Sequence, residues 1–279
     1  MGTTGRIRLG ANDYGKAENR VVRIYRDTPR HEIRDVTVST ALRGDFSAAH
    51  LAGDQSRVLP TDTQKNTVYA YAKEHGLREI EDYALTLARH FVSDVEPVEG
   101  ARIEVDEHTW ERIDDHAWVR RESEVRTTVV EVSGAGETVR SGLKDLVLLK
   151  STGSEFAGFL RDGYTTLQET HDRIMSTSLV ATWTYAATDV DWDKTWTDVR
   201  AILLERFASV HSLALQQTLW EMGKAVLETH PEIEEISLSA PNKHHFVVDL
   251  TPFGLENPNE VFHAATAPYG LIQATVVRD

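Results

Sequence analysis

One short pattern has residue types that could do chemistry: Thr61, Asp62, Thr63 and Gln64. A threonine answered by a glutamine three residues later is typical of a capping box at the start of a helix. The N-terminus of a helix presents free backbone N–H groups and a partial positive charge, and both favour a small anion. The pattern therefore predicts a helix capped by Thr61, with a start that is suited to an anionic ligand.

Three other short patterns imitate known sites and are better explained as local structure. Residues 10–17 almost spell a phosphate-binding loop, but Ala17 stands where a serine or threonine would hold magnesium. Gly134-Ala135-Gly136 lies between two strand patterns, so we predict a hairpin turn rather than a dinucleotide site. Residues 189–193 resemble a calcium loop, but Lys194 replaces the required glycine. Carboxylates at the start of a helix explain that segment better.

The apolar pattern predicts the same order of elements twice, as strand-strand-helix-helix-strand-strand. In the first half we expect strands at 20–26, 33–43, 101–113 and 117–132, with helices at 61–74 and 79–93. In the second half we expect strands at 139–151, 178–186, 233–240 and 244–250, with helices at 192–209 and 214–229. This order predicts an α+β fold of two units, residues 1–136 and 137–279, each an antiparallel sheet with helices on one face.

Composition excludes several classes of function. The 279 residues contain no cysteine, which excludes disulfides, thiolate nucleophiles and iron–sulfur clusters. The net charge of −14 argues against binding to nucleic acid or to an anionic membrane, because both require dense positive charge. His244 and His245 are neighbours on an expected strand, so they should point to opposite faces and do not suggest a metal site. The N-terminus has no apolar signal region and no apolar segment is long enough to span a membrane, so we expect a cytoplasmic protein.

Four segments together resemble the urate oxidases, which oxidise uric acid with dioxygen. They are Tyr14-Gly15-Lys16, residues 59–67 (LPTDTQKNT), residues 151–162 (STGSEFAGFLRD) with Asp172-Arg173-Ile174, and residues 241–246 (PNKHHF). The resemblance covers nearly the whole chain in the order of the family. It implies two tunnelling-fold units in each chain and a homotetramer in which the sheets close into a barrel. It also implies active sites at the subunit interfaces.

The resemblance assigns a proton relay to Lys16, Thr61 and His244. In the family, the matching lysine and threonine hydroxyl pass protons together. The threonine and the aspartate that follows it, here Thr61 and Asp62, also meet the purine through their backbone. A neutral lysine amine could accept the threonine proton while threonine accepts one from urate.

The resemblance also implies a substrate clamp. Arg173 matches the arginine that grips the pyrimidine side of urate, a task suited to a planar, permanently charged guanidinium. Gln216 matches the partner glutamine, with Gln217 as the neighbouring alternative. Phe156 would stack on the purine, and Asn242 would hold dioxygen or water above it. Leu215 is bulkier than the valine that is common at its position, and Pro60 replaces a residue that often offers an N–H.

The activity implied is conversion of urate, dioxygen and water to 5-hydroxyisourate and hydrogen peroxide without any cofactor. Deprotonated urate is electron-rich and can itself reduce dioxygen, so the protein would supply proton removal, orientation and a protected cavity. Two alternatives stay open. One is another tunnelling-fold enzyme of pterins or purines, often with zinc. The other is a non-catalytic purine-binding homologue that has lost the relay.

Overall fold

A computed structural model describes residues 7–120 and 124–279 and divides them into two units. The described residues of the first unit are 7–120 and 126–141, and those of the second are 124–125 and 142–279. The division falls inside one long strand, β7 (Gly136–Lys150). The hairpin turn predicted at Gly134 is confirmed, because Gly134 and Ala135 are the turn between β6 and β7.

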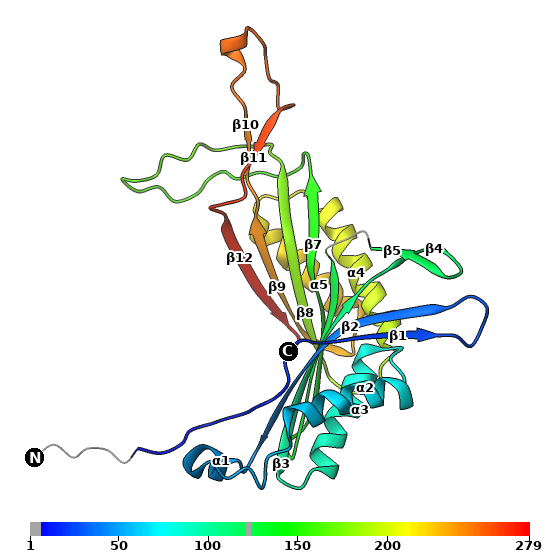
Figure 1. The fold of residues 1–279 in the computed structure, drawn as a ribbon. Helices are drawn as coiled ribbons and strands as arrows, with labels where there is room; N and C mark the ends of the chain where they lie inside the picture. Colours follow the sequence, from blue (N-terminus) through cyan, green and yellow to red (C-terminus); the bar gives the residue numbers. More distant parts are fainter. Residues whose placement is uncertain (1–6, 121–123) are drawn as a thin grey trace, which may run out of the picture. The chain divides into compact units, whose positions relative to one another are not determined.

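The sheet of the first unit has the strand order β1-β2-β3-β6-β7. β1 pairs with β2 and β2 with β3, both antiparallel, and helices α2 and α3 lie beside these strands (Figure 1). The strands are β1 (Asn19–Tyr25), β2 (Glu32–Gly44), β3 (Val98–His108) and β6 (Val125–Ser133), and the helices are α1 (Ser47–Ala52), α2 (Thr61–Glu74) and α3 (Ile80–Asp94). Val36, Val38 and Leu42 alternate along β2 and are completely buried. They form one layer of an apolar core.

A buried charge cluster fastens α3 to its sheet. Glu81, in the first turn of α3, accepts hydrogen bonds from Arg126 at 2.8 Å and from the Ser141 hydroxyl at 2.5 Å. Glu81 is wholly buried, and Arg126 is nearly so. A buried carboxylate is tolerated only where it is paired and hydrogen-bonded, as it is here. The cluster therefore holds α3 at one position on β6 and β7.

The sheet of the second unit has the strand order β7-β8-β9-β12. β8 (Met175–Tyr185), β9 (Ile233–Asn242) and β12 (Gly270–Val277) pair antiparallel, and α4 (Trp192–Ser209) and α5 (Leu215–Thr229) lie beside them (Figure 1). Gly223 of α5 lies against Val276 of β12, where an added Cβ would come within 2.5 Å of a valine methyl group. The small residue therefore sets how closely α5 packs on the sheet.

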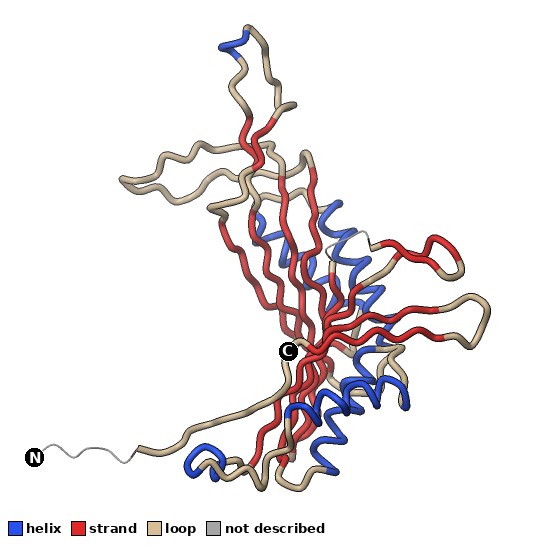
Figure 2. The backbone as a smooth tube through the Cα atoms, viewed as in Figure 1, coloured by secondary structure: helices blue, strands red, loops and turns tan. Residues whose placement is uncertain are grey.

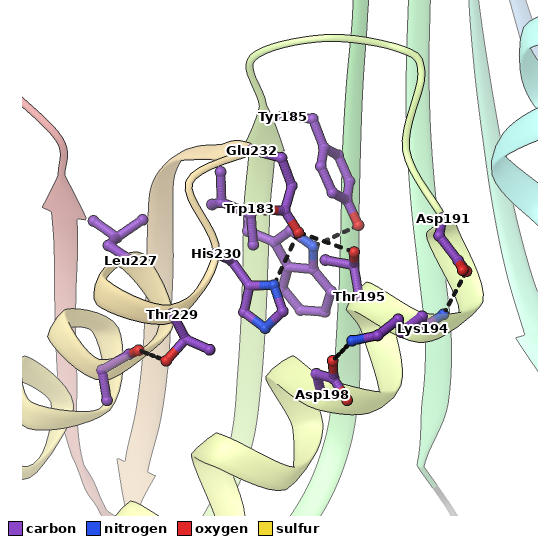
Figure 3. Close-up of polar contacts among 12 residues, drawn as sticks. Trp183, Tyr185, Asp191, Lys194, Thr195, Asp198, Leu227, Thr229, His230 and Glu232 are labelled. Atoms are coloured by element: carbon purple, nitrogen blue, oxygen red, sulfur yellow. Dashed lines mark hydrogen bonds and ion pairs between the residues drawn. The ribbon is translucent and has the colours of Figure 1, made fainter.

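Polar side chains join the start of α4 to the chain that follows α5 (Figure 3). The ring of His230 is paired with Glu232 at 2.9 Å, and Thr195 donates to the same carboxylate oxygen at 3.1 Å. The Asp191 side chain accepts from the Lys194 backbone N–H at 3.0 Å and so caps α4. The interpretation of residues 189–193 as the start of a helix is therefore confirmed.

Several predicted elements need correction. The strand expected at 101–113 ends at His108, and a small antiparallel hairpin follows, β4 (Glu111–Asp114) with β5 (Ala117–Val119). The strand expected at 117–132 is divided between β5 and β6, with residues 121–123 outside the described residues. The strand expected at 244–250 is only β10 (His245–Val247), which pairs with β11 (Phe262–Ala264), and η1 (Thr251–Phe253) follows β10.

Helix α1 and strand β12 were not predicted. β12 completes the edge of the second sheet, where it pairs with β9 along the whole length from Gly270 to Val277. The chain leaves the sheet after β9 and returns only after the β10–β11 excursion (Figure 2). Sequence periodicity cannot show such a return, because the pairing is non-local. None of the helices in the described part of the chain combines the length and apolar character that crossing a membrane requires.

Candidate active site

A cavity of about 930 Å³ lies in the second unit. Six of the predicted site residues line it: Phe156, Arg173, Leu215, Gln216, Asn242 and His244. They come from the β7–β8 loop, from the first turn of α5, and from the end of β9 with the turn that follows it. These segments are far apart in the sequence. The fold therefore converges these six residues on one concave surface, the usual form of a small-molecule site.

Backbone hydrogen bonds hold the β7–β8 loop in the shape that presents Phe156 and Arg173. Phe156 and Thr170 exchange two backbone bonds, of 2.8 and 3.0 Å. The Arg173 N–H donates to the Ser154 carbonyl at 2.9 Å. Most of this segment is loop (Figure 2), so these bonds replace a regular sheet in positioning its side chains.

The guanidinium of Arg173 is prepared for an acceptor. Its Nε is buried and has no hydrogen-bond partner among residues 7–120 and 124–279. Burial also lowers the pKa of this arginine from its usual range. A buried donor without a partner is costly. The residue also lines the cavity, so its guanidinium is available to a ligand there.

His244 lies between β9 and β10, next to the charge of Arg173. Its carbonyl accepts from the Ala265 N–H at 2.9 Å, which ties this turn to the returning chain. Burial, and after it the positive charge of Arg173, lower the pKa of His244, so the neutral imidazole is favoured. The expectation that His244 and His245 occupy opposite faces of one strand is wrong, because β10 begins at His245 and both residues line the cavity.

The first turn of α5 distinguishes the two neighbouring glutamines. Gln216 lines the cavity, whereas the Gln217 side chain accepts from the Leu213 N–H at 2.9 Å, just before the helix. Leu215 lines the cavity as a buried apolar residue. Of the two neighbouring glutamines, Gln216 is therefore the one placed to meet a ligand in the cavity.

Glu155 is a residue near the site to which sequence reasoning gave no role. Its carboxylate pairs with His211 at 2.5 Å and with His171 at 3.2 Å, and its N–H donates to the Ser212 carbonyl at 2.7 Å. Hydrogen bonds from His211 and then from His171 hold the pKa of Glu155 below its ordinary value. Glu155 directly precedes Phe156 in the quoted motif, and that adjacency was the only available signal.

Lys16, Thr61 and Asp62 lie in the first unit. Lys16 and Thr40 are joined through their backbones, with the Thr40 N–H donating to the Lys16 carbonyl at 2.9 Å. Thr61 is the first residue of α2. The pKa of Asp62 is lowered chiefly by its hydrogen bond with Lys65, and the charge of Lys16 adds to the effect. Lys16 and Asp62 are therefore electrostatically coupled at the start of α2.

The predicted capping box at Thr61 is wrong. The N-cap position belongs to Pro60, whose side chain can accept no hydrogen bond, and Thr61 is already helical. Gln64 does not reach back to the cap. Instead it is buried, and its amide oxygen accepts from the Thr40 hydroxyl at 2.7 Å. A hydroxyl on strand β2 has therefore replaced the expected partner in the cap of the helix.

The phosphate-loop pattern at residues 10–17 is an extended segment in the structure. Tyr14 and Leu42 exchange backbone bonds of 3.1 and 2.8 Å, and the next element is strand β1 rather than a helix. Among the described residues, no group of three or more histidine, aspartate or glutamate side chains is arranged to hold a metal ion. That the reaction needs no metal stays a prediction.

Comparison with known proteins identifies the family. The family model described as Uricase matches residues 12–131 and 139–273. The uricase of Arthrobacter globiformis is 55% identical over 279 residues, covering 99% of this chain and 92% of that protein. The uricase of Dictyostelium discoideum is 36% identical, covering 96% of each.

Solved structures agree in fold. The crystal structure of uricase from Arthrobacter globiformis superposes with a TM-score of 0.96 at 55% identity, covering 98% of this chain and 96% of that one. A urate oxidase structure from Bacillus sp. TB-90 has a TM-score of 0.84 at 22% identity, covering 96% and 100%, and supports the fold alone. The predicted α+β fold, an antiparallel sheet with helices, is confirmed. The chain belongs to the uricase family.

Proposed function

We propose that this chain oxidises urate with dioxygen and water to 5-hydroxyisourate and hydrogen peroxide, with no metal, flavin or haem. Family membership supports this, since the matched relatives are named uricases. The observation that carries the assignment to this chain is the cavity lined by Phe156, Arg173 and Gln216 with Asn242 and His244. These side chains offer a ring face, a guanidinium fork and amide groups, which match a flat, anionic purine.

Arg173 and Gln216 bind urate along one edge in this proposal. Arg173 lines the cavity, and its planar guanidinium can donate to urate oxygen or nitrogen. Phe156 packs against the ring face, and Leu215 closes the apolar side of the cavity. Asn242, at the end of β9, holds dioxygen or water above the purine.

Proton transfer belongs to Lys16, Thr61 and His244. Thr61 takes a proton from urate as its own hydroxyl proton passes to the amine of Lys16. His244, whose lowered pKa favours the neutral ring, can accept a proton near dioxygen or water. Two electrons leave urate and reduce dioxygen. The two protons that complete hydrogen peroxide come from urate and water, and the remaining hydroxide oxygen bonds to the purine.

We further propose a homotetramer whose sheets close into a barrel, with each active site shared between two chains. Lys16, Thr61 and Asp62 of one chain then complete the cavity of another chain that carries Arg173 and His244. Closing the sheets would also pair their exposed edges. Assignment of residues 1–136 and 137–279 as tunnelling-fold units and the cytoplasmic location stay predictions.

The experiment that tests the function adds urate aerobically to protein treated with a chelator and then dialysed. Urate absorbance and dissolved dioxygen are followed together, and both should fall in equal amounts. Arg173→Ala should lose the activity, whereas Arg57→Ala, a surface arginine paired with Glu96, should keep it. Activity that disappears with the chelator and returns with zinc would favour the metal-dependent alternative. Binding of urate without turnover would favour the non-catalytic homologue.

A further inference from the structure

The side chain of Gln64 is wholly buried in the first turn of α2, three residues after Thr61. Burying an amide is costly unless its oxygen and nitrogen both find partners. The oxygen accepts from the Thr40 hydroxyl at 2.7 Å, and the nitrogen lies 3.5 Å from the Leu59 carbonyl oxygen. Both ends of the amide are therefore directed at neighbouring segments of the first unit.

Thr40 passes this contact on to Lys16. The Lys16 N–H donates to the Thr40 hydroxyl oxygen at 3.0 Å, and the Thr40 N–H donates to the Lys16 carbonyl at 2.9 Å. Because the hydroxyl oxygen already accepts from Lys16, its one proton is free to go to Gln64. The chain of donors is thus directional, from the Lys16 backbone through Thr40 to Gln64.

Tyr14 closes the same network from the other side. Its hydroxyl donates to the Leu59 carbonyl at 3.0 Å, the oxygen that Gln64 also approaches. Between Tyr14 and Lys16, Gly15 lies so close to β2 that an added Cβ would stand 1.6 Å from the Thr40 carbonyl oxygen. Residues 14–16 therefore lie in close contact with the strand that holds Thr40.

We propose that Gln64 is a positioning residue for the reaction, which sets the separation between Lys16 and Thr61. This inference rests on the proposed function, since it gives the contacts of Gln64 a role in the proton relay of Lys16 and Thr61. Gln64 is buried on the same helix as Thr61 and acts through Thr40 and Leu59. Proton transfer depends steeply on donor–acceptor placement, and a displacement of about 1 Å can cost about 100-fold in rate.

The Gln64→Glu variant separates this role from simple stability. One carboxylate oxygen can still accept from Thr40, but the other faces the Leu59 carbonyl with no proton to donate. Protonation restores a donor there, and burial beside an acceptor raises the pKa of this carboxyl group. The ratio of variant to wild-type kcat should therefore approach one at low pH and fall as pH rises.

Threonine variants supply a matched series. Thr40→Val removes the hydroxyl at nearly constant shape and should lower kcat at least about tenfold through misplacement of Lys16. Thr40→Ser keeps the hydroxyl and should restore most of the rate. Thr67→Val is the control, because Thr67 lies on the same helix as Gln64 and its hydroxyl donates to the Thr63 carbonyl of that helix. It should leave kcat unchanged.

Steady-state kcat is measured for each variant across pH and normalised to the folded fraction from circular dichroism. A pH-independent kcat ratio for Gln64→Glu, or full activity of folded Thr40→Val, would overturn the positioning role. Should either variant fail to fold, Tyr14→Phe removes only one part-buried hydroxyl from the network and should still lower kcat. Its wild-type rate would also count against the proposal. Inactive wild-type protein would instead refute the proposed function itself.

Discussion

The ring of Phe156 stacks on the ring of Phe159, with centroids 5.0 Å apart and planes inclined by only 14°. The Arg173 guanidinium also lies 5.3 Å from the centre of the Phe156 ring. The aromatic residue proposed to pack on urate is thus held by two neighbours of the same loop. Stacked rings and a cation over a ring face are both stabilising geometries.

Phe159→Leu should loosen Phe156 and weaken urate binding. Aromatic pairs contribute about 0.5–1.5 kcal/mol beyond their burial, so KM should rise about 2- to 10-fold. The urate KM and kcat are measured by initial rates, and kcat should change less than KM. Tyr164→Leu is the control, because Tyr164 is an exposed aromatic residue of the same loop. An equal rise of KM in that control would show that loop integrity matters, and not the Phe156–Phe159 stack.

Lys16→Met and Thr61→Ala should each lower kcat severely, and the double variant should be little worse than either. Groups that act as one proton-transfer unit have strongly non-additive effects. The three kcat values are compared in a double-mutant cycle, with Lys73→Met in the last turn of α2 as a surface control. Independent losses that multiply would mean that Lys16 and Thr61 do not work as a relay.

Arg173→Met should raise the pKa of His244. The arginine charge is the second cause of the lowered pKa and burial is the first, so the value should stay below the ordinary 6.5. The imidazole is followed by NMR during a pH titration. Arg161→Met, which removes a guanidinium from over Phe159, should leave His244 unchanged. An unaltered His244 pKa in Arg173→Met would contradict the electrostatic coupling of these residues.

The same shift predicts how His244 affects stability. Its pKa is lower in the folded protein than in the unfolded chain, so the unfolded chain binds more protons between the two values. The contribution of His244 to the free energy of unfolding is therefore fully present above the ordinary histidine pKa. It is lost as the pH falls below that value. Denaturant unfolding of the wild type and of His244→Gln, measured across this range, should show a steeper loss at low pH for the wild type.

Glu155→Gln should weaken the attachment of the Phe156 loop to the α4–α5 connection. The histidine partners of Glu155 lower its pKa in the folded protein. The contribution of Glu155 to stability is therefore present above the ordinary carboxyl pKa and is lost as pH falls through the lower folded value. At neutral pH the variant should show a higher urate KM than the wild type. Glu228→Gln is the control, because Glu228 is a surface carboxylate of α5 paired with Lys224. If the two variants behave alike, the histidine contacts of Glu155 do not matter for binding.

Mixing inactive Thr61→Ala with inactive Arg173→Ala should restore activity if the sites are shared. After joint unfolding and reassembly, half of the pairs should be mixed, and each mixed pair should carry one intact and one doubly damaged site. Random reassembly through a two-fold interface should therefore give roughly a quarter of wild-type activity. Refolding each variant separately should give none. Verified mixed oligomers without activity would show that each chain builds its own site.

The sequence by itself determined the local elements and the identity of the family. The helices predicted at 61–74 and 192–209 match α2 and α4, because the pattern that indicates a helix is local. The carboxylates predicted at the start of α4 are confirmed, with Asp191 as its cap, whereas the predicted Thr61 cap of α2 is wrong. The motif residues Phe156, Arg173 and Gln216 were assigned by resemblance, and the structure places all three on one cavity. Their convergence is the work of the fold, because the β7–β8 loop and α5 are separate segments of the chain.

Only the tertiary structure decided where Gln64, Glu155 and strand β12 find their partners. Gln64 had a plausible local partner in the cap of its own helix, but a buried hydroxyl on β2 provides a better one. Glu155 meets His211 across the chain, and β12 pairs with β9 after a long excursion. These contacts join residues 24 to 56 positions apart in the chain. Their free energy depends on burial and on neighbouring segments, and neither is encoded in local spacing.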